Sequence, residues 1–192
     1  TCALPISPMY LAKVNYKRED VTHILSSILK NIISDNTVII CIGTDRAIGD
    51  ALGPLVGTML KNSDFKYPVY GTLDNPIHAL NIYESIEQIK SKHSSSQFLA
   101  IDACLGSASN IGNIQIREGP ILPGKGVGKK LPQVGTYSIV GIVDKIDENN
   151  RFSFNNIRLH FILELAETIA LSLLLATRSE ERRVGKECRS RW

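Results

Sequence analysis

The sequence is poor in the residue types that assign a protein to a class at sight. It has four cysteines in 192 residues, and two of them, Cys2 and Cys188, lie near the ends. The other two, Cys41 and Cys104, are too few for a disulfide framework. We expect reduced thiols, as in a cytosolic protein. Cys104 as a nucleophile is the weaker alternative, because no histidine partner is apparent in the sequence.

An excess of charge of one sign is also missing once the ends are set aside. Residues 1–7 and 178–192 resemble translated frames of a sequencing adapter, so we expect both to be non-native segments. The alternative is a genuine basic tail that binds nucleic acid or anionic lipid. The tail holds six of the 22 basic and three of the 19 acidic residues, which leaves 16 of each in residues 8–177. We therefore expect no nucleic-acid partner.

No long hydrophobic run is evident. The run Ile169 to Ala176 is too short to span a bilayer, and Glu164 and Glu167 interrupt its upstream extension. A secretory signal is not recognisable either. The roughly 170 residues between the ends suit one domain with a substantial core. We expect a single cytoplasmic domain over residues 8–177, with no membrane partner.

Apolar periodicity indicates alternating strands and helices. Helices are predicted over 18–33, 51–61 and 155–176, and strands over 37–43, 67–72, 97–102, around Ile114 and Ile116, and over 137–143. This order favours an α/β fold of three layers, with a mostly parallel twisted sheet between helices.

A further helix is expected from Asn75 and Pro76, because asparagine suits the N-cap and proline the first helical position. Its predicted buried stripe consists of Ala79, Ile82, Tyr83, Ile86 and Ile89.

Two acidic residues stand where predicted strands end. Asp50 follows the strand over 37–43, and Asp102 closes the strand over 97–102. Because the carboxyl ends of parallel strands meet at one edge of a sheet, we expect the two side chains to lie close together. Such a pair can share a proton and activate a water molecule, or hold a metal. The structural alternatives are a helix cap at Asp50 and a turn at Asp102.

The segment over residues 43–50 is a poor candidate for a nucleotide site. It matches neither the dinucleotide-binding glycine pattern nor the phosphate loop, and Asp45 and Asp50 would repel a phosphate. We therefore expect no cofactor. His78 is a candidate third ligand if Asp50 and Asp102 hold a metal, and its alternative is a partly exposed helix residue.

The segment from Gly119 to Pro132 is rich in glycine, proline and lysine. Its part from Gly124 to Lys130 is a candidate peptide clamp, because exposed glycine amides pair with extended peptides and lysines attract acidic side chains. We therefore expect a protein or peptide substrate as the partner, and homo-oligomerisation stays open. The alternative for the segment is a mobile connector. The predicted substrate-binding residues are Gly126, Val127, Gly128 and Lys129.

Four motifs in order, over residues 43–54, 71–81, 101–106 and 123–135, resemble those of the YyaC-type sporulation proteins, often called spore proteases. The resemblance covers roughly residues 16–177. It implies an endospore-forming bacterium as the source and the cytoplasm of a sporulating cell or developing spore as the location.

More distantly, the motifs resemble those of the germination protease, whose proposed catalytic pair carries over to Asp50 and Asp102. The hydrogenase maturation endopeptidases share the same fold and place two acidic nickel ligands at these positions. Their third ligand, a histidine, would fall near Pro132 or Gln133, and neither replaces it.

The hypothesis is therefore a sporulation-associated peptidase of aspartic type, in which Asp50 and Asp102 hydrolyse peptide bonds of spore proteins. Two alternatives remain open. One is a non-catalytic peptide- or protein-binding factor that uses the same site around Asp50 and Asp102. The other is a metal-dependent endopeptidase with Asp50, Asp102 and His78 on the ion.

Overall fold

A six-stranded sheet forms the centre of the molecule, in the order β1-β5-β6-β4-β2-β3. The computed structural model describes residues 9–123, 131–145 and 157–178. The strands are β1 Met9–Asn15, β2 Thr37–Cys41, β3 Val69–Tyr70, β4 Gln97–Gly106, β5 Asn113–Glu118 and β6 Tyr137–Lys145. β2 is parallel to β3 and β4, and β4 is parallel to β6, whereas β5 is antiparallel to β6 and to β1. Every strand except β5 therefore runs in one direction, which confirms the mostly parallel sheet.

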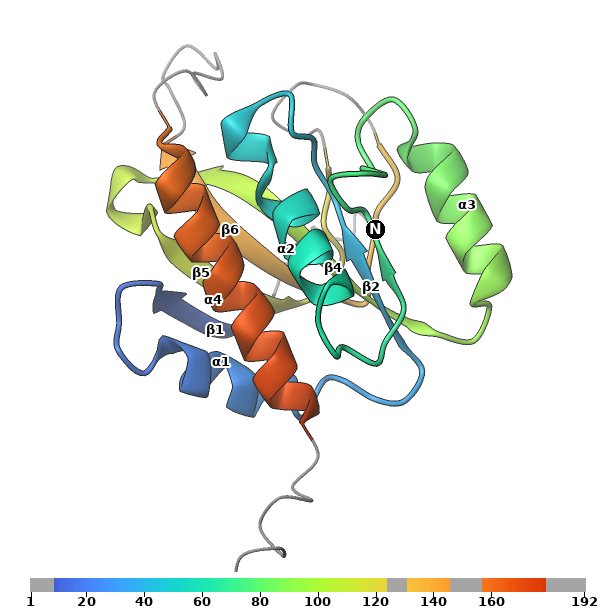
Figure 1. Ribbon diagram of the computed structural model, residues 1–192, viewed down its shortest axis with the longest axis horizontal. Coiled ribbons are helices and arrows are strands. Elements are labelled where there is room, and N and C mark those ends of the chain that lie inside the picture. The colour runs from blue at the N-terminus through green and yellow to red at the C-terminus, as the bar shows by residue number, and fades with distance from the viewer. Residues whose placement is uncertain (1–8, 124–130, 146–156, 179–192) are drawn as a thin grey trace, which may run out of the picture.

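Helices cover both faces of this sheet, and the three-layer α/β architecture is thereby confirmed. The helices α1 Val21–Leu29, α2 Leu52–Lys61 and α4 Leu159–Thr177 lie over one face, and α3 Ile82–Lys92 lies on the other side (Figure 1). Each face has its own cluster of buried apolar side chains. Two helical layers thus bury the two faces of the sheet, as parallel strands require.

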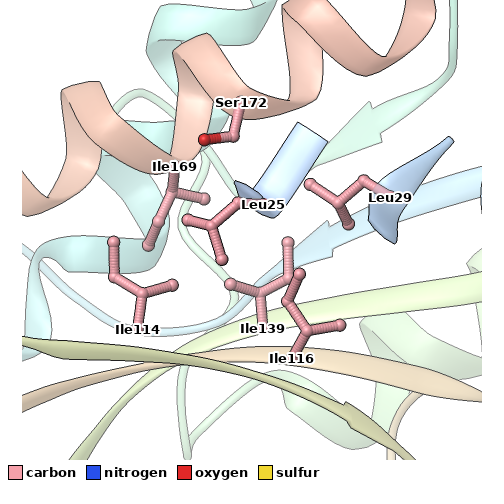
Figure 2. A pocket seen from close by; sticks show the side chains of 7 residues that line it. All are labelled: Leu25, Leu29, Ile114, Ile116, Ile139, Ile169 and Ser172. Carbon is pink, nitrogen blue, oxygen red and sulfur yellow. The ribbon is translucent and has the colours of Figure 1, made fainter. Parts of the chain in front are cut away.

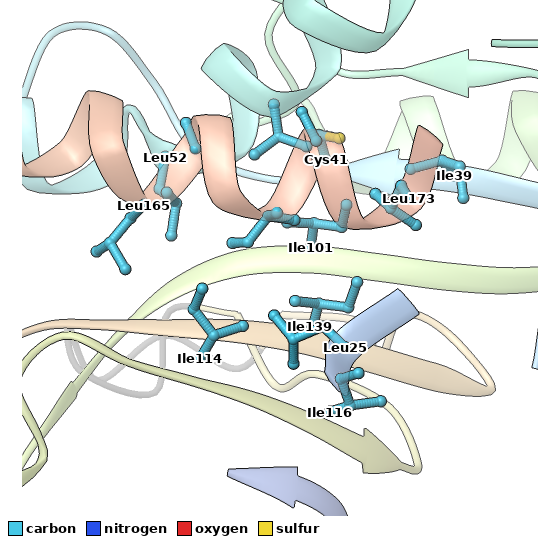
Figure 3. Packing of buried hydrophobic residues seen from close by; sticks show 14 of the residues in the cluster. Leu25, Ile39, Cys41, Leu52, Ile101, Ile114, Ile116, Ile139, Leu165 and Leu173 are labelled. Carbon is cyan, nitrogen blue, oxygen red and sulfur yellow. The ribbon is translucent and has the colours of Figure 1, made fainter. Parts of the chain in front are cut away.

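The burial of β2 on both faces follows from the alternation of side chains along a strand. Ile39 and Cys41 belong to the cluster under α1, α2 and α4 (Figure 3). Val38 and Ile40 belong to the cluster under α3. Each fully buried aliphatic side chain contributes about 1.5–3 kcal/mol to stability. The buried strand β2 therefore gives a stable position to the loop that follows it.

An apolar gap lies in the core below α1 and α4, and Figure 2 shows its walls. It is lined by Leu25, Leu29, Ile114, Ile116, Ile139, Ile169 and Ser172. The Ser172 hydroxyl donates a hydrogen bond to the carbonyl oxygen of Thr168, at 2.7 Å. The gap has no room for a water molecule, so it belongs to the packing of the core rather than to a binding site.

Several element boundaries differ from the predictions. The strand β1 was not predicted, the strand expected over 67–72 is reduced to Val69–Tyr70, and β4 continues beyond residue 102 to Gly106. The first helix covers Val21–Leu29 instead of 18–33. The last helix begins at Leu159, and residues 155–156 of its predicted range lie outside the described residues.

The helix expected from Pro76 begins only at Ile82. Asn81 is the physical reason: its side chain accepts a hydrogen bond from the His78 amide at 2.8 Å and donates one to the Pro76 carbonyl oxygen at 2.9 Å. These bonds hold the segment in a non-helical turn. The predicted stripe is correct for Ile82, Ile86 and Ile89, but Ala79 is half-buried and Tyr83 is exposed.

The helix α4 is longer than the apolar run from which it was predicted. By length and composition it could cross a membrane, with a mean hydropathy of 1.8. It also packs against α1 and α2, and Leu165, Ile169 and Leu173 on it are buried in the core. The expected absence of a membrane partner stays a prediction. So does the non-native origin of the ends, since residues 1–8 and 179–192 lie outside the described residues.

Candidate active site

A tight loop brings Asp50 to the carboxyl end of β2. The loop starts at Gly43, whose φ is +138°, and a Cβ there would collide with the carbonyl oxygen of Asp50. The Thr44 amide donates to that same oxygen at 3.0 Å, and the Asp50 amide donates to the Ala47 oxygen at 3.0 Å. Asp50 closes the short 3-10 helix η1 Ile48–Asp50, while the residue capping α2 is Ala51. A helix cap is therefore not the role of Asp50.

Asp102 lies within β4 rather than at its end, so the prediction that it terminates a strand is wrong. The pairing of β2 with β4 stops at Ile101, opposite Cys41, and Asp102 pairs with Val140 of β6 instead. It is thus the first β4 residue beyond the end of β2. Its side chain is buried, and Oδ1 accepts a hydrogen bond from the Ala103 amide at 2.8 Å. A turn role for Asp102 is excluded by this strand position.

The two carboxyl groups interact electrostatically. Burial raises the pKa of Asp102 well above its usual range, the charge of Asp50 raises it further, and only the hydrogen bond from Ala103 opposes the shift. Burial also raises the pKa of Asp50, against smaller opposing effects of the Thr44 backbone and of His78. Both acids lie where β2 ends at the edge of the sheet, and their pairing as a catalytic site stays a prediction.

His78 reaches the same edge from the turn before α3. Its neighbour Ile77 forms a parallel bridge with Ile42, and the Gly43 amide donates to the Ile77 oxygen at 2.8 Å. His78 is half-buried and close enough to lower the pKa of Asp50. Its Nδ1 accepts a hydrogen bond from the Leu80 amide at 3.3 Å. A neutral His78 in this geometry carries its proton on Nε2 and can act as a donor there.

The donor set gives no support to a metal centre. Within residues 9–123, 131–145 and 157–178, no three histidine, cysteine, aspartate or glutamate side chains are grouped so that they could hold an ion. Pro132 and Gln133, where a third ligand would fall by resemblance, supply no such donor. The assignment of Asp50, Asp102 and His78 as metal ligands stays a prediction.

The predicted peptide-binding residues Gly126, Val127, Gly128 and Lys129 lie outside the described residues, and their role stays a prediction. No motif in the sequence points to Lys61 and Lys92, which line a groove at the edge of the sheet. Only the tertiary structure brings these lysines, from separate helices, to one place. No local sequence pattern could have revealed their proximity.

Comparison with known proteins shows the family. Residues 13–172 match the family described as protein of unknown function DUF1256. The chain belongs to the DUF1256 family. The chain is also similar to the uncharacterized protein YyaC of Bacillus subtilis (strain 168), with 42% identity over 165 residues that cover 85% of this chain and 80% of YyaC. The resemblance to YyaC-type proteins is therefore confirmed.

Among solved structures, the NiFe hydrogenase maturation protease HycI from Thermococcus kodakarensis KOD1 is similar. The TM-score is 0.39 and the identity 18%, over 77% of this chain and 99% of that chain. A likeness at this distance does not bear on the chemistry of the DUF1256 site.

Proposed function

We propose that this DUF1256 protein is a peptidase of aspartic type that hydrolyses peptide bonds with Asp50 and Asp102. The single observation that carries the proposal is the placement of two acids from separate elements at one edge of the sheet. The η1 turn brings Asp50 to the carboxyl end of β2, and Asp102, buried in β4, lies just beyond that end, where the charge of Asp50 raises its pKa. One protonated and one ionised carboxyl are the two groups that this reaction needs. The motif resemblance supports spore proteins as substrates.

The two carboxyl groups have different roles in the proposed mechanism. Ionised Asp50 takes a proton from a water molecule as its oxygen attacks the peptide carbonyl carbon, and protonated Asp102 donates its proton to the carbonyl oxygen. The C–N bond of the resulting diol then breaks. The leaving amine takes the proton from Asp50, and a diol hydroxyl returns a proton to Asp102.

The decisive experiment compares three asparagine variants on acid-extracted spore proteins and on labelled casein. Asp50→Asn and Asp102→Asn each remove one proton-transfer group, so kcat/KM should fall at least about 100-fold. Asp45→Asn is the matched control, because Asp45 is exposed in the same loop, and it should retain activity within about twofold. Product formation is followed by mass spectrometry. Equal cleavage by all three variants would contradict the mechanism.

The same assay separates the non-catalytic alternative. A binding protein would retain spore proteins on a column without forming product, and neither Asp50→Asn nor Asp102→Asn would change the amount bound. The observation that favours this alternative is the basic groove beside the sheet, which can bind without any carboxyl pair.

We further propose that the protein acts in the cytoplasm of a sporulating cell or developing spore, with a protein or peptide substrate as its partner. The motif resemblance supports this setting. Nucleic acid, membrane and cofactor are not part of the proposal. Homo-oligomerisation stays open, and light scattering of the purified chain measures it directly.

A further inference from the structure

A groove runs along the outer edge of the sheet at β3. It has a volume of about 370 Å³, within the range of ligand sites in proteins. β3 forms its base, Lys61 at the end of α2 lines one side, and Gln88 and Lys92 of α3 line the other. The groove thus lies where both helical layers reach the edge strand.

The charge of this groove has one sign. Lys61 and Lys92 line it, and its other described lining residues include no aspartate or glutamate. The ammonium group of Lys92 lies 6.0 Å from the centre of the Tyr70 ring, and the Tyr70 hydroxyl is hydrogen-bonded to Nε2 of His93 at 2.8 Å. Tyr70 is therefore held in place beside one of the two cations. An occupant that complements this groove carries negative charge.

The base of the groove is suited to an extended chain. Within the described part of the molecule β3 pairs with β2 alone, so its outer side can pair with an added strand. The groove continues to Ile77, which bridges Ile42 and directly precedes His78. A chain lying along β3 would thus run toward the edge that holds Asp50 and Asp102.

We infer that the groove binds an acidic peptide segment in extended conformation, added to the sheet at β3 with its carboxylates between Lys61 and Lys92. Charge complementarity selects acidic side chains, and the edge strand selects a polypeptide over a small anion. This inference goes beyond the peptidase proposal because it concerns binding. It holds equally for a chain that does not cleave.

The test uses the full chain with Asp102→Asn, so that turnover does not consume the probe, and repeats the key titrations with the wild type. The probe is a fluorescein-labelled octapeptide of alternating glutamate and valine, followed by fluorescence anisotropy. We expect it to bind at least tenfold tighter than its glutamine–valine counterpart in 50 mM salt, with the difference shrinking in 500 mM salt. Replacing Lys61 and Lys92 together by glutamate should weaken binding at least tenfold.

The matched control replaces Lys66 and Lys90 together by glutamate. Both are exposed, Lys90 lies in the last turn of α3 beside Lys92, and neither lines the groove. This variant carries the same net charge and should change affinity less than threefold. Equal loss in both double variants, equal binding of the neutral peptide, or no binding of the acidic peptide would overturn the inference.

A second probe tests strand addition. Methylating the amides of alternate peptide residues should weaken binding at least tenfold for one alternation and not for the other, because only one edge of the added strand faces β3. If neither methylated peptide differs from the parent, or if free glutamate competes as well as the peptide, the groove is a site for small anions and the inference is wrong. Circular dichroism verifies that each variant is folded.

Discussion

Among single residues, Asp102 is unusual because it is an ionisable side chain buried within a central strand of the sheet. Its pKa is raised in the folded protein, first by burial and then by Asp50. Folding therefore favours the protonated form. The stabilising effect of the bound proton is fully present below the unfolded-state pKa of aspartate, about 4. It is lost as the pH rises through the higher folded-state pKa.

This sign predicts the behaviour of Asp102→Asn. The amide is neutral at every pH and its oxygen can still accept the hydrogen bond from Ala103. The variant should therefore melt at a higher temperature than the wild type at pH 8, by about 2–4 °C for each kcal/mol regained. The difference should vanish below about pH 4. Calorimetry across this range tests it, and a variant less stable than the wild type at pH 8 would contradict the buried-charge description.

Gly43 offers a second prediction at the scale of single residues. Both Gly43 and Gly119 have positive φ, but a Cβ at Gly119 meets no heavy atom within 4 Å, whereas one at Gly43 collides with the Asp50 backbone. Gly119→Ala should cost about 1–2 kcal/mol from backbone strain alone. Gly43→Ala should cost more than about 3 kcal/mol. Urea titration measures both, and equal costs would show that the loop is not held against Gly43.

Among the secondary-structure elements, sequence periodicity predicted the buried strands and the amphipathic helices well, because their side chains alternate as geometry requires. It failed where tertiary pairing decides. Among the described residues, β1 is an edge strand that pairs only with β5. Its Met9 and Tyr10 are exposed, so its sequence pattern carries little signal. The start of α3 at Ile82 depends on side-chain bonds of Asn81, which propensity does not anticipate.

The contact between α2 and β6 supplies a prediction for the elements. A Cβ on Gly141 of β6 would collide with Cδ2 of Leu52, the first residue of α2 and fully buried. Gly141→Ala should therefore cost about 1–3 kcal/mol, and Leu52→Ala about 2–5 kcal/mol. Together they should cost less than the sum, since the new methyl group fills part of the space that the leucine leaves.

The matched background for this cycle is Leu29→Ala, because Leu29 is equally buried in the same cluster but does not contact Gly141. There the two costs should add within about 0.5 kcal/mol. Additivity in both backgrounds, measured by urea titration, would mean that α2 does not sit on Gly141 in solution.

For the whole molecule, the alternation of strands and helices predicted the α/β layers, which the structure has. The same pattern placed Asp50 and Asp102 at one edge of the sheet, because parallel strands end there together, while the pairing of the two acids stays a prediction. The sequence pattern could not predict that β4 extends beyond the end of β2, or that His78 lies on a turn. Nor could it predict that Lys61 and Lys92 line one groove. Those features depend on register and on which strand occupies the edge. Local periodicity predicts neither the register of the strands nor which strand lies at the edge.

The charge distribution gives a prediction at this scale. Residues 8–177 carry equal numbers of basic and acidic side chains, whereas the full chain has a net charge of +3. The full chain should therefore bind DNA weakly at 20 mM salt, and a chain limited to residues 8–177 should not. The shorter chain contains every described helix and strand, so its melting temperature should be unchanged. DNA binding by the shorter chain in a gel-shift assay would contradict the expectation that residues 8–177, which have no net charge, do not bind nucleic acid.

Because β4 extends beyond the end of β2, the two acids are held by different parts of the fold, and their spacing can change during evolution. Asp102 is anchored by pairing to β6, whereas Asp50 arrives on a short loop closed by two backbone hydrogen bonds. Insertions or deletions between Thr44 and Ala47 would therefore reposition one acid while the scaffold stays intact. Evolution, or a designer building loop libraries, can retune the spacing of the two acids from that side alone.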